Sequence, residues 1–244
     1  SEMCIRDRCS GCNFRLAKKD LLVVFLLSLL RATTSFSLLI AYQNIATGVA
    51  STIHFMYPLA VSLAMMFFFH EKKSLLVMLA VLMSLFGAAL LSSGELEAKS
   101  GDTIVGLVAA CISVFSYGGY IIGVRTTRAA QINSTVLTCY VMGMGAVFYL
   151  IGAMATSGLH LVTDGYIWLI ILGLALPATA ISNITLVRAI KYAGPTLTSI
   201  LGAMEPLTAV VIGVFVFKEL FTLNSVIGIL LILLAVGMVA VSYT

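Results

Sequence analysis

YPLAVSLAMMFFFHE (Tyr57–Glu71) and EPLTAVVIGVFVFKE (Glu205–Glu219) are two copies of one pattern, and they decide the fold of this chain. The copies lie 148 positions apart, and the apolar segments before them align without a gap. Each copy is preceded by an apolar run and a short turn, carries a proline, and closes with a glutamate before a further apolar run. The matched pairs are Pro58 with Pro206, Leu59 with Leu207, Phe67 with Phe215, Phe69 with Phe217 and Glu71 with Glu219. The matched proline and glutamate would rarely recur by chance among apolar residues, so we infer an internal repeat.

The composition is that of a chain whose solvent is lipid. Hydrophobic residues make up 61% of the 244 and charged residues 10%, and the mean hydropathy is +1.11. A soluble domain carries about 25% charged residues. Eight stretches have about the 20 mostly apolar residues that a bilayer-spanning helix needs: 20–42, 49–70, 74–93, 104–125, 134–156, 166–189, 195–217 and 222–243. The sequence therefore predicts an all-α polytopic membrane protein with eight transmembrane helices, because helices satisfy their backbone polar groups internally.

The basic residues between these stretches gather on one side of the membrane. If the helices alternate in direction, one set of ends carries Arg15, Lys18, Lys19, Lys72, Lys73, Arg125, Arg128, Arg188 and Lys191. The other set carries Lys99 and Lys218, with Glu95, Glu97, Asp102 and Asp164. Because cytoplasmic loops are enriched in Lys and Arg, we place the start of the chain in the cytoplasm. The first copy of the repeat then runs inward and the second runs outward, so the two copies are inverted.

The repeat also predicts the domain organisation. Residues 13–94 form the last three helices of a first repeat, and residues 104–243 form a complete second repeat of five helices. The helices 104–125 and 134–156 have no counterpart in the first repeat, so we expect ten helices in the parent protein and eight in this chain. Residues 1–12 look like a non-native tail, and the C-x-x-C within them receives no functional weight.

Two segments carry a resemblance to a known family: ATGVASTIHFMYPLAV (46–61) and GPTLTSILGAMEPLTAVV (194–211). With the closing Phe-x-Phe-x-Glu and a last helix that contains glycine (Gly87, Gly237), the pattern resembles the EamA-type transporters of the drug/metabolite transporter superfamily. The likeness covers about residues 16–244. It implies two five-helix units in a ten-helix carrier with both termini in the cytoplasm. It also implies export or exchange of small metabolites, driven by an ion gradient or by the gradient of the solute itself.

Two charged residues lie near the centre of predicted spans, where a charge costs about 2.5–3.5 kcal/mol. Arg31 lies in the helix 20–42 and Glu205 in the helix 195–217, each about eleven residues from the helix start. Two interpretations are open. The pair either binds a charged substrate or a proton, or it forms a structural ion pair that fixes helix packing.

Polar and aromatic residues at helical spacing add further candidates. Tyr57 is equivalent to Glu205 in the repeat, so we expect the two to face each other across a pseudo-twofold axis. His54, one turn before Tyr57, either takes part in proton coupling or is a hydrogen-bonding core residue. The predicted substrate-binding residues are Arg31, Ser35, His54, Tyr57, Ser116, Tyr117, Tyr120, Asn183 and Glu205. The predicted hinges are Pro58, Pro177 and Pro206, because proline frees backbone carbonyls within a span.

The inverted repeat predicts a secondary transporter that works by alternating access. The resemblance implies an exporter or exchanger of small metabolites, and we expect amino acids or similar amphipathic solutes. A passive channel and an intramembrane enzyme are the alternatives, although motifs such as H-E-x-x-H and G-x-S-x-G are absent from the sequence. The expected partners are a small-molecule substrate and the lipid bilayer. Nucleic acid is not expected, because the net charge of +4 is not gathered in a patch. Neither a cofactor nor a metal is expected. Coupling to a proton gradient and a homodimer are open, and the predicted location is a bacterial inner (plasma) membrane.

Overall fold

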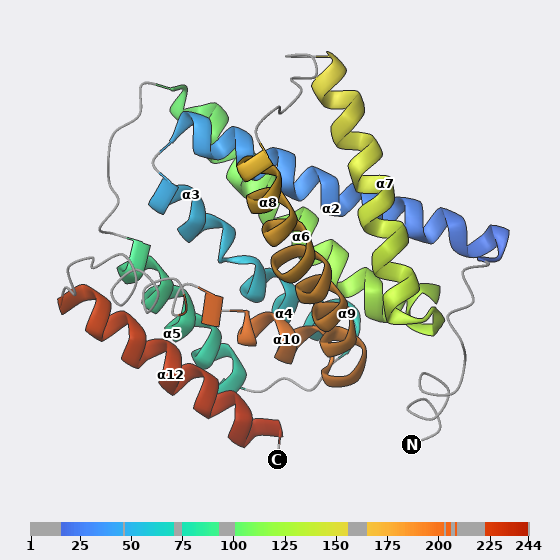
Figure 1. Ribbon diagram of the computed structural model, residues 1–244. Coiled ribbons are helices and arrows are strands. Elements are labelled where there is room, and N and C mark those ends of the chain that lie inside the picture. The colour runs from blue at the N-terminus through green and yellow to red at the C-terminus, as the bar shows by residue number, and fades with distance from the viewer. Residues whose placement is uncertain are drawn as a thin grey trace. The chain divides into compact units, whose positions relative to one another are not determined.

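The computed structural model describes residues 16–45, 47–70, 75–92, 101–155, 165–202, 204–205, 208 and 223–243. Every regular element in these ranges is helical (Figure 1). The α-helices are α2 (Lys18–Asn44), α3 (Thr47–His54), α4 (Tyr57–Phe68), α5 (Leu75–Ser92), α6 (Thr103–Thr126), α7 (Ser134–Ala155), α8 (Gly165–Gly173), α9 (Ser182–Ala193), α10 (Pro195–Leu201) and α12 (Leu223–Tyr243). A 3₁₀ turn, η2 (Arg128–Gln131), and a π-helical segment, η3 (Leu174–Ile181), complete the set.

Five segments of the described chain are long and apolar enough to cross a membrane. They are Lys18–Asn44, Val49–Phe68, Thr103–Thr126, Ser134–Met154 and Gly165–Ala193, and Leu75–Gly87 and Val226–Ala235 are shorter apolar helices. All seven overlap spans predicted from the sequence. The eighth, 195–217, is described only in part, so the total of eight stays a prediction. The large side chains exposed along these helices include Leu22, Phe86, Phe115 and Leu169. The chain is a multi-pass, all-helical membrane protein, because only lipid is a suitable solvent for such faces.

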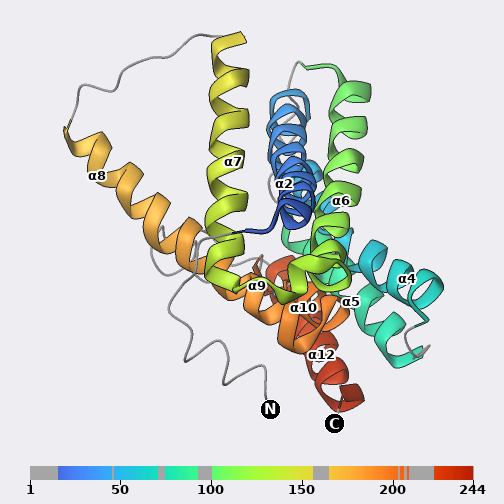
Figure 2. The same ribbon diagram turned by 90° about the vertical axis from the view of Figure 1, so that its right-hand side faces the viewer.

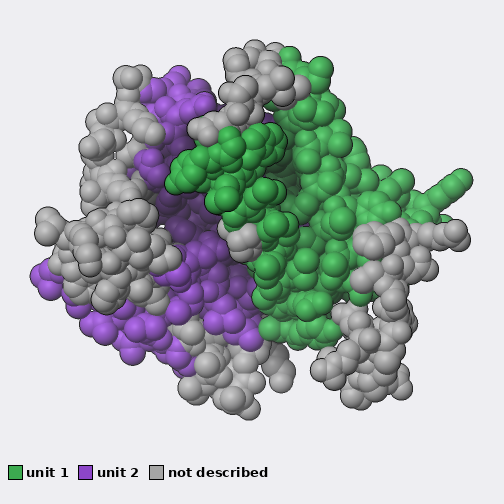
Figure 3. Space-filling view, in the orientation of Figure 1, with its two compact units in different colours: residues 1–32, 123–193 green, residues 33–122, 194–244 purple. Residues whose placement is uncertain are grey.

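The chain divides into two compact units, which Figure 3 distinguishes by colour. Unit 1 comprises residues 1–32 and 123–193, and unit 2 comprises residues 33–122 and 194–244. Each unit therefore takes segments from both of the repeats predicted from the sequence. The units are defined by contacts and the repeats by sequence pattern, so the predicted boundaries at 13–94 and 104–243 remain a prediction.

In unit 1, Pro177 lies inside a long continuous helix. α8, η3 and α9 follow one another without a break (Figure 2), and Pro177 lies inside the π-helical η3. Proline has no N–H and clashes with the preceding turn of an α-helix, and a wider π turn is one way to accommodate it. Two side chains bind nearby carbonyls: Thr179 Oγ1 donates to Leu174 O at 3.0 Å, and Asn183 Nδ2 donates to Thr179 O at 2.7 Å. The helix is continuous through Pro177, and the hinge predicted there stays a prediction.

In unit 2, α5 and α12 lie side by side (Figure 1). A Cβ at Gly87 would lie 2.8 Å from Gly228 O and 2.9 Å from Ile232 Cγ1, so the helix backbones approach as closely as glycine allows. The core here joins α5, α10 and α12 through Val77, Ala80, Val81, Ile200 and Ala235. A second core joins the end of α2 to α3 and α6 through Ala41, Ile45, Ala50, Ala109 and Ala110. These two cores fix the helices that carry the site described next.

Candidate functional site at an interrupted helix

The span Val49–Phe68 is interrupted between α3 and α4. Phe55 and Met56 form a turn in which Phe55 N donates to Ser51 O at 2.8 Å and Met56 N donates to Ile53 O at 2.9 Å. Pro58 lies in the first turn of α4, where its missing N–H costs nothing. The sequence predicted one helix over 49–70 with a proline hinge. The structure instead has two helices, because the backbone forms a turn just before the proline and a new helix begins at Tyr57.

His54, the last residue of α3, is held by a directional hydrogen-bond chain. Its Nδ1 lies 2.9 Å from Ser113 Oγ, and the Ser113 hydroxyl donates to Ala110 O at 2.6 Å. A hydroxyl has one hydrogen, and a carbonyl only accepts. Since that hydrogen is used on Ala110, His54 Nδ1 is the donor to Ser113. The neutral ring therefore carries its hydrogen on Nδ1 and accepts through Nε2.

Aromatic rings from α4 and α6 surround this histidine. The centroid of the His54 ring lies 5.6 Å from that of Tyr57 and 5.5 Å from that of Tyr117. Tyr57 and Tyr117 meet edge to face at 4.7 Å, and Tyr120 stacks beyond Tyr117 at 6.4 Å. The three tyrosines are buried, while His54 is half-buried. The structure thus brings together four of the predicted site residues: His54, Tyr57, Tyr117 and Tyr120.

The hydroxyl of Tyr57 lies directly over the backbone of Gly202, at the end of α10. A Cβ at residue 202 would lie 1.8 Å from Tyr57 Oη, so this contact requires glycine. Glu205 is one turn further on, since its N–H donates to Gly202 O at 3.0 Å. Glu205 therefore lies within electrostatic reach of Tyr57.

Two further buried hydroxyls lie on the helices that form this contact. Ser62 Oγ on α4 and Thr198 Oγ1 on α10 have no hydrogen-bond partner within the described residues. α4 and α10 pack against each other, and Thr198 accepts the N–H of Gly202 through its carbonyl. Buried hydroxyls normally have hydrogen-bond partners. The contact between α4 and α10 therefore holds two hydroxyls that could bind a further polar group.

The other predicted site residues lie elsewhere or in other roles. Ser35 in α2 is half-buried, and Ser116 in α6 is buried. Asn183 is buried in unit 1 and uses its amide within its own helix. Arg31 is half-buried and belongs to unit 1, whereas Glu205 belongs to unit 2, so their pairing stays a prediction. Pro206 lies outside the described residues, as do Glu71 and Glu219.

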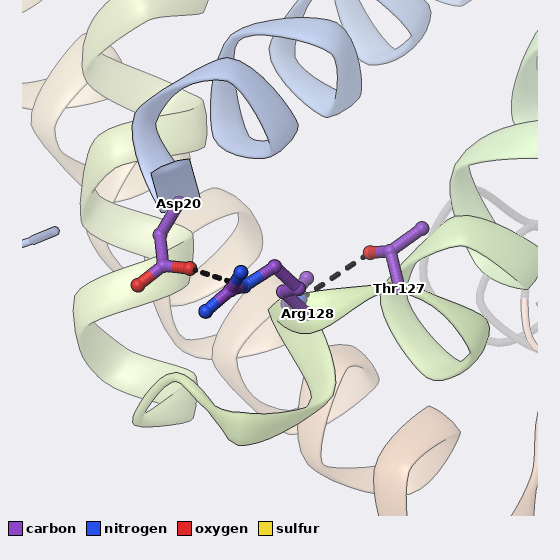
Figure 4. Close-up of polar contacts among 4 residues, drawn as sticks. Asp20, Thr127 and Arg128 are labelled. Atoms are coloured by element: carbon purple, nitrogen blue, oxygen red, sulfur yellow. Dashed lines mark hydrogen bonds and ion pairs between the residues drawn. The ribbon is translucent and has the colours of Figure 1, made fainter. Parts of the chain in front are cut away.

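A charged cluster joins three helix ends in unit 1. Arg128 Nε lies 3.0 Å from Asp20 Oδ1, and Figure 4 shows these side chains pointing toward each other, with Thr127 beside them. Arg125 donates to the carbonyl of Lys191, and the Lys191 ammonium donates to the carbonyl of Ile132. The start of α2, the end of α6 and the end of α9 therefore meet. These are three of the four places where the charge pattern puts basic residues on the cytoplasmic side.

Sequence reasoning missed two residues of the main cluster. Helical spacing grouped Ser113 with Ser116, Tyr117 and Tyr120, and it grouped Gly202 with Thr198, Glu205 and Ala209, but it gave neither residue a role. Their roles depend on which helices pack together, and helical periodicity does not give that. Within the described part of the chain, no three His, Cys, Asp or Glu residues are arranged to hold a metal ion.

Together, the apolar spans and the helical architecture of the described residues define a multi-pass membrane protein. The chain belongs to the EamA-like transporter family, whose sequence profile matches residues 104–241, more than half of its length. No curated protein matches the sequence significantly. A protein of known crystal structure is similar over 99% of this chain and 82% of its own, with a TM-score of 0.81 and 17% identity. That likeness supports the fold, and the family identifies a membrane transporter of small solutes.

Proposed function

We propose that the protein is a secondary carrier that exports or exchanges amino acids or similar amphipathic solutes by alternating access. The observation that carries the proposal is the break at Phe55–Met56 beside His54, Tyr57 and Glu205, in a member of a transporter family. Carriers commonly bind solutes where a membrane helix is discontinuous, because backbone and side-chain polar groups are then exposed inside the protein.

The repeat supports this proposal further. In the first copy, the break follows His54, which lies four residues before Pro58. In the second copy, α10 ends just before Gly202, which lies four residues before the equivalent Pro206. Two equivalent interruptions in inverted copies would give a polar site that each side of the membrane reaches in turn. In this proposal the solute contacts Arg31, Ser35, Ser116 and Asn183 as well as the cluster around Tyr57, and the membrane is a bacterial plasma membrane.

Counterflow in liposomes tests the proposal. Protein is reconstituted in vesicles loaded with unlabelled standard amino acids, and uptake of the labelled amino acids is followed. We expect saturable counterflow that Glu205→Gln and Arg31→Ala each reduce, with normal membrane insertion. Matched controls are Glu95→Gln, a carboxylate predicted to lie outside the bilayer, and Lys18→Ala, an exposed cation at the start of α2.

Three results would count against the proposal. Flux that does not saturate would indicate a passive channel, and absence of counterflow for every amino acid would remove the proposed substrate class. Normal counterflow in both variants would show that the site lies elsewhere. Mapping of loop accessibility adds an independent check, because the inverted arrangement requires Lys72 and Lys218 to lie on opposite faces of the membrane.

A further inference from the structure

We propose that His54 is the proton-carrying group of this carrier, that it exchanges its proton at Nε2, and that Glu205 is its charge partner. The proposal rests on the proposed transport function and deepens it, because it names the coupling ion and the atom that binds it.

The first step is the asymmetry of the imidazole. Because Ser113 donates to Ala110, Nδ1 of His54 keeps its hydrogen in both the neutral and the charged ring. Only Nε2 can then gain or lose a proton. Ser113 is fully buried in α6, so the ring is held in one orientation while its other nitrogen titrates.

The second step is the surroundings of the charged ring. His54 ends α3, and the carbonyls at a helix C-terminus favour a cation. The rings of Tyr57 and Tyr117 lie within the range of about 6 Å over which an aromatic face attracts a cation. Half-burial opposes the charge. The helix end and the aromatic rings favour the charged ring, and burial opposes it. A change in solvent access or in the charge partner can therefore move a proton onto or off the ring.

The third step is the charge partner. Offset by 148 residues, His54 is equivalent to Gly202 and Tyr57 is equivalent to Glu205. Tyr57 of the first copy contacts Gly202 of the second copy, which is the residue equivalent to His54. If a twofold axis relates the copies, each such contact has a reciprocal. The reciprocal of the contact between Tyr57 and Gly202 is a contact between Glu205 and His54.

Within the described residues, the elements around this site carry few other titratable groups. Tyr42, at the end of α2, bonds to Ser51 of α3 at 3.2 Å, and the described part of α5, which also packs on α3, has no titratable side chain. From α6 come Tyr117 and Tyr120, with Asp102 and Cys111 toward its start. Apart from Glu205 and Asp102 these groups are phenols and a thiol, and Asp102 binds the N–H groups of Ile104 and Val105 at the start of α6.

Nuclear magnetic resonance of protein labelled with ¹⁵N-histidine tests the site without any substrate. The His54 signals are assigned by their loss in His54→Asn. We expect the Nδ1–H tautomer in the neutral ring, and titration of Nε2 between about pH 5 and 8. Ser113→Ala should introduce the other tautomer, and Ser113→Thr, which keeps the hydroxyl, should not. An Nε2–H tautomer in the wild type, or no titration in this range, would overturn the proposal.

Transport in liposomes tests the coupling. Accumulation of amino acids driven by a pH gradient is compared with counterflow at equal pH, which requires no net proton movement. In His54→Asn, which keeps a side-chain N–H toward Ser113, we expect the ratio of driven accumulation to counterflow to fall at least about fivefold, the low end of ordinary coupling energies. His70→Asn, at an exposed histidine after α4, should leave both rates unchanged.

The two proposals fail in different ways. If wild-type protein shows counterflow but a pH gradient drives no accumulation, or if His54→Asn keeps the wild-type ratio, proton coupling at His54 is wrong and the carrier function stands. If wild-type protein shows no counterflow of any amino acid, the proposed function is wrong, and the titration of His54 still reports on the proton site itself.

Discussion

Replacing Gly202 by alanine tests the contact that holds the candidate site together. The added Cβ would lie 1.8 Å from Tyr57 Oη, 3.1 Å from Tyr57 Cζ and 3.0 Å from Ser199 O. Ordinary contact distances of about 3.5 Å require the hydroxyl to retreat by about 1.7 Å. The Tyr57 ring is 2% exposed and meets Tyr117 edge to face at 4.7 Å, so it has little room to move. Overpacking of this kind costs about 1–3 kcal/mol.

The expected result is a lower thermal midpoint for the purified protein in detergent, measured by circular dichroism. In a chain of this length each kcal/mol corresponds to about 2–4 °C, so Gly202→Ala should lower the midpoint by about 2–12 °C. Tyr57→Phe alone should cost no more than about 1.5 kcal/mol, the usual net value of one hydrogen bond. Combined with Tyr57→Phe, Gly202→Ala should cost much less than alone, because the 1.8 Å contact is then gone.

Gly143→Ala is the matched control. A Cβ at Gly143, within α7, would meet nothing within 4 Å. Alanine is favoured over glycine in a helix by about 0.5–1 kcal/mol, so this variant should be as stable as the wild type or slightly more stable. If Gly202→Ala is equally harmless, or if Tyr57→Phe does not rescue it, Tyr57 does not lie over Gly202 and the cluster has another arrangement.

Two other contacts give predictions of the same kind. Gly87→Ala should destabilise the protein by about 1–3 kcal/mol, because its Cβ would lie 2.8 Å from Gly228 O. Gly237→Ala in α12, with nothing within 4 Å, should not; equal midpoints for the two variants would disprove the close approach of α5 and α12. Asp20→Asn should cost less than about 1 kcal/mol, because Arg128, its partner in the ion pair, is 56% exposed. The exchange Asp20→Arg with Arg128→Asp should recover part of that loss, and high salt should abolish the difference; a loss that persists in high salt would contradict an exposed ion pair.

The positions of the helices were predictable from the sequence, whereas the behaviour of their prolines was not. Long apolar runs locate helices well, because each run has to satisfy its own backbone in lipid. Pro58 and Pro177 both lie within such runs, but Pro58 begins a new helix and Pro177 sits in a π turn. The backbone differs at the two prolines. Thr179 and Asn183 bind carbonyls around Pro177, whereas a turn at Phe55–Met56 precedes Pro58. A proline within an apolar run therefore has two different local structures in this chain.

The residue types of the site were also partly predictable, whereas its partners were not. The cost of charge in a membrane singled out Glu205, and helical spacing singled out Tyr117 and Tyr120. The bond from His54 to Ser113 depends on α3 packing beside α6, and the contact of Tyr57 with Gly202 depends on α4 packing beside α10. A pattern along one helix contains no information on which neighbour that helix meets. Helical spacing grouped Gly202 with Glu205, and the repeat offset links Gly202 to His54, but neither signal gives the contact with Tyr57.

The two copies of the repeat differ at the positions where they meet, and packing explains one of these differences but not the other. A histidine at position 202, copied from position 54, would occupy the space of the Tyr57 hydroxyl, since even a single Cβ would lie 1.8 Å from it. Glycine at 202 is therefore required by packing whatever the solute. Glu205 replaces the tyrosine of the first copy, yet its side chain is exposed, so no steric reason excludes an aromatic ring there. A carboxylate in a predicted span costs about 2.5–3.5 kcal/mol. Because packing does not require that cost, we expect the carboxylate of Glu205 to serve transport rather than the fold.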